Sequence, residues 1–245
     1  MTKNIHEFSA LTFDCYGTLI DWESGIWDAL QPLLMVNHVS HIDRKTGLEE
    51  YARIEAEQEA ETPEMPYHEV LAQVHRKLAD KFALKTSDDL DHGFGASVRH
   101  WPAFADTADA LRILKRHFKL VILSNVNRDG FISSNRKLGV KFDAIYTAED
   151  GSYKPNPANF AYMLQHLEKD FTVHKEQVLH TAQSLHHDHV QARAFGLANA
   201  WIDRQGLKDS ENWGATAKVE ERPEYDFYFT TMMEMAEFCE AAKKD

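Results

Sequence analysis

The chain has 245 residues, of which 43% are hydrophobic and 27% charged, and its formal net charge at pH 7 is −12. This length and composition predict one large globular core, or a core with a smaller second domain. The negative charge disfavours a polyanion such as nucleic acid as a partner. Residues 1–10 hold no apolar signal core and no apolar run could span a bilayer, so no membrane partner is expected. Cys15 and Cys239 are too few for a disulfide framework, and the expected location is the cytoplasm.

The first strong signal is the short apolar run 10–13, which ends abruptly in Asp14. Such a run suits a strand buried on both faces of a parallel sheet, and Gly17 then ends the strand. Asp14 is therefore expected at the carboxyl end of a buried strand, where open α/β sheets bind their ligands. A carboxylate in this position is a nucleophile or a metal ligand, or else it simply caps a turn or a helix.

Residues 21–99 show helical periodicity and no strand signal. The expected helices cover 21–36, 48–61, 68–82 and 87–100, with 38–47 as a polar connection. A break follows the second helix, around Pro63 and Pro66. This stretch is predicted to be a helical insertion into the domain that begins with the first strand.

After Pro102 the pattern alternates between strand and helix, which predicts an α/β fold with a doubly wound parallel sheet. The core is then discontinuous: residues 1–19 and 101–245 form it, and residues 20–100 form the inserted domain. Residues 206–224 are polar and loop-like. The expected helices are 106–117, 129–138, 157–167, 187–195 and 231–242, and the expected later strands are 120–123, 142–147, 178–182, 200–202 and 226–229.

Polar clusters follow four of the predicted strands, and the carboxyl ends of parallel strands meet at one edge of a sheet. The clusters are residues 14–18, 124–125, 154–155 and 183–188. Each has an ordinary alternative: Lys154 in an exposed turn, Ser124 and Asn125 as a helix cap, Asp188 as a first-turn carboxylate. The joint pattern, with each cluster behind a strand, favours a single site.

The chemistry expected of that site starts from Asp14 as a nucleophile. A nucleophilic carboxylate needs a cation to keep it ionised, which Lys154 can supply. Ser124 and Asn125 offer donors that position a substrate. Asp188 can hold Lys154 or orient a water molecule.

These motifs resemble the haloacid dehalogenase superfamily, and most closely its L-2-haloacid dehalogenase (type II) branch. The matching segments are Phe-Asp-Cys-Tyr-Gly-Thr-Leu at 13–19, Leu-Ser-Asn at 123–125 and Tyr-Lys-Pro at 153–155. A partial fourth match comprises Asp188, Ala192, Phe-Gly at 195–196 and Trp-Ile-Asp-Arg at 201–204. The resemblance implies a Rossmann-like core, with the helical insertion in the place of the family's cap.

Two positions bear on the reaction that the resemblance implies. Phosphatases of the superfamily carry a second Asp two residues after the nucleophile, and this chain has Tyr16 there. Tyrosine is typical of the dehalogenase branch, in which the leaving halide needs no proton; the alternative is a core aromatic. Metal-dependent members carry a further Asp where this chain has Gln183. We therefore expect no metal ion and no other cofactor.

The implied mechanism is attack by Asp14 on the halogen-bearing carbon, which gives an aspartyl ester and inverts the stereocentre. Water then hydrolyses the ester, with Asp188 as its base or positioner and Lys154 as the charge partner. Thr18, Ser124 and Asn125 are expected to hold the carboxylate of a small-molecule substrate, and Tyr16 to help exclude water.

The remaining expectations concern the insertion and the fourth cluster. The branch uses a cap arginine to abstract halide, for which Arg44 or Arg53 is the candidate, and Gln183 and Ser184 are expected beside the Lys154–Asp188 pair. Histidines 186, 187 and 189 more plausibly pack or cap a helix than bind a metal. Apolar helices of the insertion are compatible with a homodimer. The aromatic candidates for the pocket wall are Trp22, Trp27, Tyr67 and Trp101.

Two rival functions stay open at this point. One is a Mg²⁺-dependent phosphatase of small phosphoesters that tolerates Tyr16. The other is a member of the same fold that has lost turnover and binds a small carboxylate or a protein.

Overall fold

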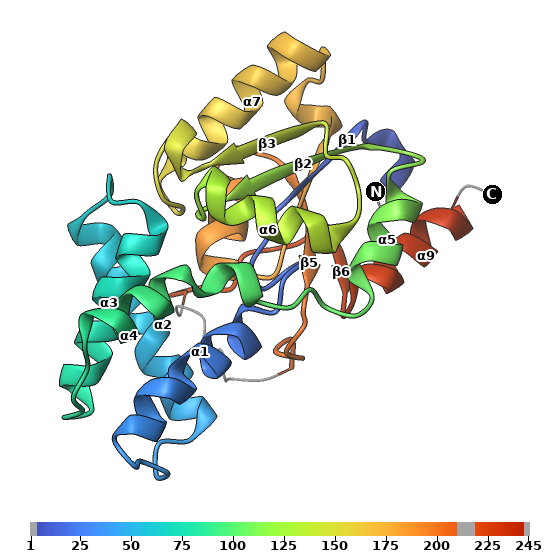
Figure 1. Ribbon diagram of the computed structural model, residues 1–245. Helices are drawn as coiled ribbons and strands as arrows, with labels where there is room; N and C mark the ends of the chain where they lie inside the picture. Colours follow the sequence, from blue (N-terminus) through green and yellow to red (C-terminus); the bar gives the residue numbers. More distant parts are fainter. Residues whose placement is uncertain (1–3, 210–218, 243–245) are drawn as a thin grey trace.

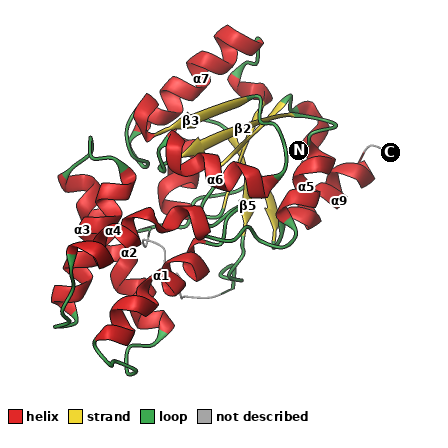
Figure 2. Cartoon of the chain, viewed as in Figure 1, coloured by secondary structure: helices red, strands yellow, loops and turns green. Residues whose placement is uncertain are grey.

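A computed structural model describes residues 4–209 and 219–242, and within them the chain forms a six-stranded, wholly parallel sheet flanked by helices (Figures 1 and 2). The predicted α/β class with a doubly wound sheet is therefore confirmed. The strands are β1 (Ala10–Phe13), β2 (Lys119–Ser124), β3 (Ala144–Thr147), β4 (Val178–Ala182), β5 (Ala198–Ile202) and β6 (Phe227–Phe229).

The strand order is β3-β2-β1-β4-β5-β6, so β1 lies in the middle of the sheet. The chain adds β2 and β3 on one side of β1, then crosses back to place β4 on the other side. Phe13 at the end of β1 is aligned with Ile122 in β2 and Thr181 in β4. This reversal creates a crevice beyond the carboxyl ends of β1 and β4, where such sheets bind ligands.

Each face of the sheet is covered by its own helices, because side chains alternate along a strand. Leu120 and Ile122 of β2 pack in one apolar cluster, and Val121 and Leu123 pack in the other. The first cluster takes in α5 (Thr107–Leu114), α6 (Arg128–Leu138) and α9 (Met232–Ala242), and the second takes in α7 (Pro157–Phe171) and α8 (Val190–Ala194).

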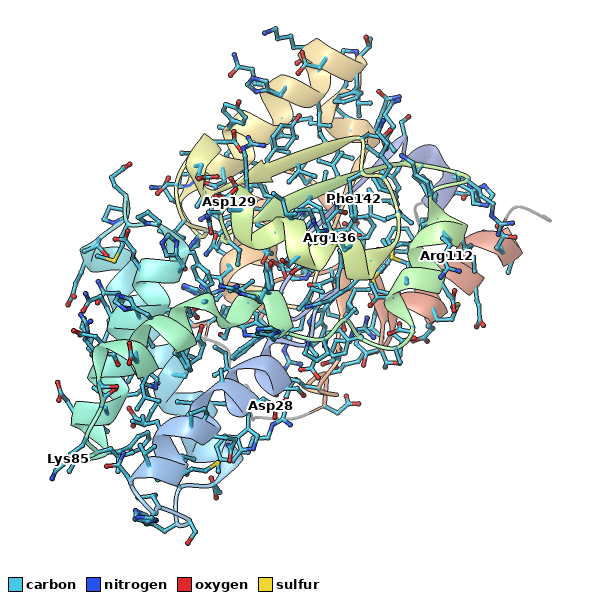
Figure 3. The ribbon with its side chains drawn as sticks, viewed as in Figure 1. Asp28, Lys85, Arg112, Asp129, Arg136 and Phe142 are labelled. Carbon is cyan, nitrogen blue, oxygen red and sulfur yellow. The ribbon has the colours of Figure 1, made fainter. Side chains whose placement is uncertain are left out.

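The helical insert between β1 and α5 forms a separate layer at one end of the sheet (Figure 1). The chain leaves and re-enters the core at one place, since Ile20 pairs with Ala103 and the Asp21 N–H donates to the Pro102 carbonyl at 2.8 Å. Exposed Lys85 on the insert and Arg112 on α5 lie at opposite sides of Figure 3. The elements of the insert are α1 (Trp22–Val36), α2 (Arg44–Glu61), α3 (Tyr67–Lys81), α4 (Asp88–Gly95) and a 3₁₀ helix (Ala96–His100).

Two expected boundaries were wrong. Helix α2 begins at Arg44 rather than at residue 48, because the Asp43 carboxylate accepts from the Thr46 N–H at 2.8 Å and caps the helix four residues earlier. The helix expected over 187–195 opens instead as a π turn, Leu185–His189, before α8. Of the polar stretch 206–224, residues 210–218 lie outside the described part of the chain.

The expected helix 87–100 is divided into α4 and the 3₁₀ helix that follows it. The other ends differ from the sequence expectation by a few residues, as helix and strand ends commonly do. No helix among the described residues combines the length and apolar character needed to cross a membrane.

Candidate active site

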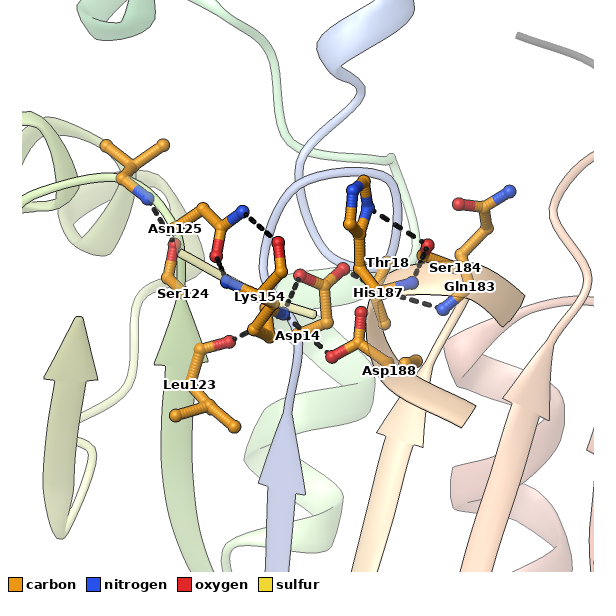
Figure 4. Close-up of polar contacts among 12 residues, drawn as sticks. Asp14, Thr18, Leu123, Ser124, Asn125, Lys154, Gln183, Ser184, His187 and Asp188 are labelled. Atoms are coloured by element: carbon orange, nitrogen blue, oxygen red, sulfur yellow. Dashed lines mark hydrogen bonds and ion pairs between the residues drawn. The ribbon is translucent and has the colours of Figure 1, made fainter. Parts of the chain in front are cut away.

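The polar clusters behind the strands converge on a cavity of about 90 Å³ between the edge of the sheet and the helical insert (Figure 4). Core residues on its lining include Asp14, Asn125, Lys154, Gln183 and Asp188. The strand–helix topology brings them together because each follows the carboxyl end of a neighbouring parallel strand.

Asp14 is held on both of its oxygens. Lys154 Nζ donates to Oδ1 at 2.8 Å, and the Thr18 hydroxyl donates to Oδ2 at 2.7 Å. Asp14 is 7% exposed. Burial raises the pKa of Asp14 above its ordinary value, while Lys154 and Thr18 act in the opposite direction by stabilising the charged form. The arrangement fixes the direction of the carboxylate and leaves it at the cavity wall.

Lys154 is buried at 2% exposure and uses all three of its protons. Besides Asp14, it donates to Asp188 Oδ1 at 2.7 Å and to the Leu123 carbonyl at 3.1 Å. Burial alone would lower the pKa of Lys154, but the two carboxylates raise it above its ordinary value. Asn125 fixes the Lys154 backbone, since its Oδ1 accepts from the N–H at 2.7 Å and its Nδ2 donates to the carbonyl at 3.2 Å.

Asp188 is fully buried, and His180 supports it from strand β4. The His180 Nε2 group lies 3.0 Å from Asp188 Oδ1, and its Nδ1 lies 2.9 Å from the Thr12 hydroxyl. Burial would raise the pKa of Asp188, but Lys154 and the His180 hydrogen bond hold it below its usual range. Asp188 Oδ2 has no hydrogen-bond partner among the described residues. Asp188 is therefore an ionised carboxylate with one oxygen left for a further donor.

Two hydroxyl groups expected to hold the substrate, those of Thr18 and Ser124, form hydrogen bonds to other protein groups instead. Thr18 gives its proton to Asp14 and accepts from the Gln183 N–H at 2.8 Å, so it orients Asp14 instead. Ser124 is fully buried, accepts from the Val126 N–H at 3.1 Å and does not line the cavity. Of the expected carboxylate holders, Asn125 alone reaches the cavity wall.

Tyr16, Gln183 and Ser184 line the cavity as expected. The Tyr16 hydroxyl lies 2.9 Å from Ser134 Oγ, and its ring packs edge-on against Trp101. Gln183 Nε2 donates to Gln205 Oε1 at 3.2 Å.

Ser184 accepts from the backbone N–H of His187 at 3.1 Å, which caps the π turn and brings the His187 ring to the cavity. Burial lowers the pKa of His187 to about 4, so this imidazole is neutral at pH 7. His189 Nε2 lies 2.9 Å from the Ala182 carbonyl, in keeping with a packing role.

The expected cap arginine is not at this cavity. Arg44 lies in the first turn of α2, 3.8 Å from Glu23 and within 3.2 Å of the Ser24 hydroxyl, and it lines a neighbouring cavity. The early start of α2 directs Arg44 toward α1. Arg53 pairs with Glu50 and Glu57 at the surface. Among the described residues, the lining contains Lys154 and no arginine.

The insert contributes a cavity wall that was not expected from the sequence. Tyr51, Glu55 and Glu59 recur at intervals of four along α2, so they share one helix face, and all three line the cavity. That spacing was visible in the sequence, but an acidic stripe normally marks a solvent-exposed face. The expected aromatics Trp22, Tyr67 and Trp101 also line the cavity, and Trp27 does not.

The parallel sheet, its topological switch point and the ion-paired Asp14 there define an α/β protein with a buried carboxylate at its ligand-binding edge. The chain belongs to the haloacid dehalogenase-like hydrolase family, whose model matches residues 8–181. This membership confirms the resemblance seen in the motifs. No curated protein sequence matches the chain.

Solved structures share the fold over nearly the whole chain. The defluorinating L-2-haloacid dehalogenase Rha0230 is 16% identical, with a TM-score of 0.76 and 95% of each chain covered. The L-2-haloacid dehalogenase from Xanthobacter autotrophicus with chloropropionic acid covalently bound is 17% identical, with a TM-score of 0.76 and coverage of 95% and 98%. The magnesium-bound HAD-hydrolase YfnB from Bacillus subtilis is 18% identical, with a TM-score of 0.73 and coverage of 95% and 99%. At these identities the likeness establishes the fold.

Proposed function

We propose that the chain is a hydrolytic dehalogenase that opens the carbon–halogen bond of short L-2-haloacids through an ester on Asp14. The observation that supports it most strongly is the setting of Asp14: a carboxylate hydrogen-bonded by Lys154 and Thr18 at the wall of a cavity between sheet and insert. Beside it stands Tyr16, whose hydroxyl is engaged with Ser134, where a phosphatase of the superfamily needs an acid. A halide leaves without a proton, so a tyrosine in place of that acid does not hinder the step, although no arginine among the described residues lines the cavity to receive the halide.

In the first step an Asp14 oxygen attacks the carbon that bears the halogen, opposite the halogen. A carbon–oxygen bond forms, the carbon–halogen bond breaks, and its electron pair leaves with the halide. Lys154 keeps Asp14 ionised before attack and keeps its charge beside Asp188 afterwards. Attack from the far side inverts the stereocentre, so an L-2-haloacid gives a D-2-hydroxyacid.

In the second step water attacks the carbonyl carbon of the Asp14 ester. The unpartnered Oδ2 of Asp188 accepts one proton of that water and so orients its oxygen. The ester bond to the substrate oxygen breaks, that oxygen takes up a proton, and the hydroxyacid leaves. Asp14 regains its carboxylate, and one proton is released to solvent with the halide.

A magnesium site does not fit these side chains. Lys154 Nζ already bridges the Oδ1 atoms of Asp14 and Asp188 at 2.8 and 2.7 Å, where a cation would join the two carboxylates. At the position of the metal Asp in metal-dependent relatives stands Gln183, a weaker neutral ligand whose amide donates to Gln205.

The decisive experiment is halide release from (S)-2-chloropropionate with chelator present, comparing wild type with Asp14→Asn. We expect release by the wild type alone, and a substrate-derived mass on the tryptic peptide 4–44, which carries Asp14. Phosphate release from small phosphoesters that requires Mg²⁺ would establish the phosphatase instead. If neither halide nor phosphate is released, the chain is a binding protein rather than an enzyme.

A further inference from the structure

The wall of the cavity opposite Asp14 is acidic, and the reaction proposed above does not use it. Glu55 Oε1 accepts a hydrogen bond from the Tyr51 hydroxyl at 2.5 Å and another from the Tyr67 hydroxyl. Glu59 is only 8% exposed, and its oxygens lie at 3.4 Å from a single donor, Asn125 Nδ2. Glu59 is thus a buried carboxyl group with weak hydrogen bonding on the surface of a cavity.

The charges on the lining are unbalanced toward the negative. Carboxyl groups from the core, Asp14 and Asp188, and from the insert, Glu55 and Glu59, face one ammonium, that of Lys154, which the core pair already binds. Even with Glu59 protonated, three carboxylates oppose one cation. Because the lining carries more carboxyl groups than cations, it favours a ligand that brings an organic cation to the insert side of the cavity, and this attraction is stronger than in bulk water.

Aromatic side chains complete the same wall. Tyr16, Trp22, Tyr51, Tyr67 and Trp101 all line the cavity. Aromatic faces joined to carboxylates form the environment that binds organic ammonium groups, through attraction to the ring faces and to the full negative charges. Small alcohols or neutral amides would leave the two glutamates without a counter-charge.

We propose that the insert side of this cavity is a subsite for an organic ammonium group of the substrate, with Glu55 and Glu59 as its counter-charges. The inference rests on the proposed function for the reacting end, where Asp14 attacks carbon. The preferred substrate then carries its halogen at the Asp14 end and a primary to quaternary ammonium group at the α2 end. A haloacid carboxylate, if present, lies toward the positive charge of Lys154, the one lysine or arginine on the lining among the described residues.

The subsite can be tested without turnover, with choline and its uncharged isostere 3,3-dimethylbutan-1-ol as probes and propionate as the anion. Tryptophan fluorescence reports binding, because Trp22 and Trp101 line the cavity. We expect choline to bind at least about tenfold more tightly than the isostere, which is the scale of a desolvated cation–aromatic contact. Equal binding of the isostere, or tighter binding of propionate, overturns the proposal.

Variants locate the effect. Glu59→Gln and Glu55→Gln are expected to reduce the preference for choline about threefold to tenfold. Glu57→Gln is the matched control, because Glu57 lies on the same helix but is exposed and paired with Arg53. A reduction in the control equal to that in the Glu59 variant overturns the assignment. Since the comparison of choline with its isostere uses the wild type, the test survives a variant that fails to fold.

Reactive probes separate this inference from the proposed function. (2-Chloroethyl)trimethylammonium and 1-chloro-3,3-dimethylbutane have the same shape and differ in charge, and (S)-2-chloropropionate has no cation. If chloropropionate labels Asp14 and choline shows no preference, the subsite is wrong and the dehalogenase stands. If choline binds through Glu59 and none of the three chlorides labels Asp14 or releases chloride, the subsite stands and the dehalogenase is wrong.

Discussion

The Lys154 ammonium lies 2.7 Å from Asp188 Oδ1, and both groups are buried. The same nitrogen lies 2.8 Å from Asp14 Oδ1, so one cation serves two carboxylates from different strand ends. The Lys154 ammonium therefore serves both reactivity and stability. It keeps Asp14 ionised, and it offsets the repulsion between the two buried carboxylates.

Removal of the shared cation should destabilise the fold. Lys154→Met leaves Asp14 and Asp188 as buried, uncompensated carboxyl groups, and we expect a loss of about 3–5 kcal/mol in the free energy of unfolding. Urea denaturation at pH 7 measures it, with Lys141→Met, at an exposed position, as the control. The double variant Asp14→Asn/Lys154→Met should recover part of the loss. A loss below about 1 kcal/mol would show that the ion pairs matter little.

Asp188→Asn should separate the two chemical steps. The variant retains a side chain of the same shape but no ionised oxygen to accept a proton from water, so ester formation continues and hydrolysis slows. We expect a stoichiometric adduct on peptide 4–44 after rapid quenching, with steady-state halide release reduced by roughly 10²–10⁴-fold, the usual range for a general base. Absence of the adduct, together with a slow first turnover, would assign Asp188 to the first step instead.

The acid side of the pH profile should report Asp14. In the proposed mechanism only the ionised carboxylate attacks, and burial raises the pKa of Asp14, so kcat/KM should fall tenfold per unit of pH from a point above 3.8, the ordinary Asp value. Thr18→Val removes a hydrogen bond that favours the charged form and should move this fall to higher pH.

Thr181→Val is the matched control for that shift. Thr181 is equally buried on the neighbouring strand, and its hydroxyl has no partner among the described residues. An unchanged profile in the Thr18 variant, or an equal shift in both, would contradict the assignment.

Glu59 is expected to lower the free energy of unfolding at neutral pH. Burial and the neighbouring Glu55 raise its pKa well above the ordinary value, so folding is favoured when Glu59 is protonated. This advantage is complete below the ordinary Glu pKa and is lost as pH rises through the raised pKa. Glu59→Gln should therefore raise Tm at pH 8 by a few degrees, on the order expected for 1 kcal/mol, and by nothing at pH 4. Calorimetry at both pH values measures it; a gain that is equal at pH 4 and pH 8 would have another cause.

Gly25 permits the close contact between α1 and Trp101. A Cβ at Gly25 would lie 2.3 Å from the indole ring, which lines the cavity. Gly25→Ala should therefore destabilise the protein by about 1–3 kcal/mol and change the tryptophan emission. Gly93→Ala is the control: it lies in helix α4 with open space around its Cβ, and should stabilise by about 0.5–1 kcal/mol. If the two variants behave alike, the contact is unimportant.

The core half of the site could be predicted from sequence because its residues follow buried strands. Asp14 comes directly after an apolar run, Lys154 and Asp188 follow the ends of β3 and β4 within a few residues, and the geometry of a parallel sheet then brings them to one edge. The insert half could not. Helix packing decides which face of α2 points inward. Charge alone suggests Arg44 at the cavity and Glu59 in solvent, but Arg44 faces α1 and Glu59 lines the cavity.

The central place of β1 has a consequence for synthesis. Leu11 is aligned with Leu120 on one side and Leu179 on the other, so the first strand to leave the ribosome lacks its second neighbour until β4 has been made. At about 5–20 residues per second, roughly 10 to 30 s pass before β4 exists. Until residue 154 has been made, a growing chain carries Asp14 without the Lys154 ammonium that balances its charge in the folded protein. The site is thus incomplete until more than three-quarters of the chain has been made, and a chain that stops before β4 leaves one edge of β1 free to pair with another chain.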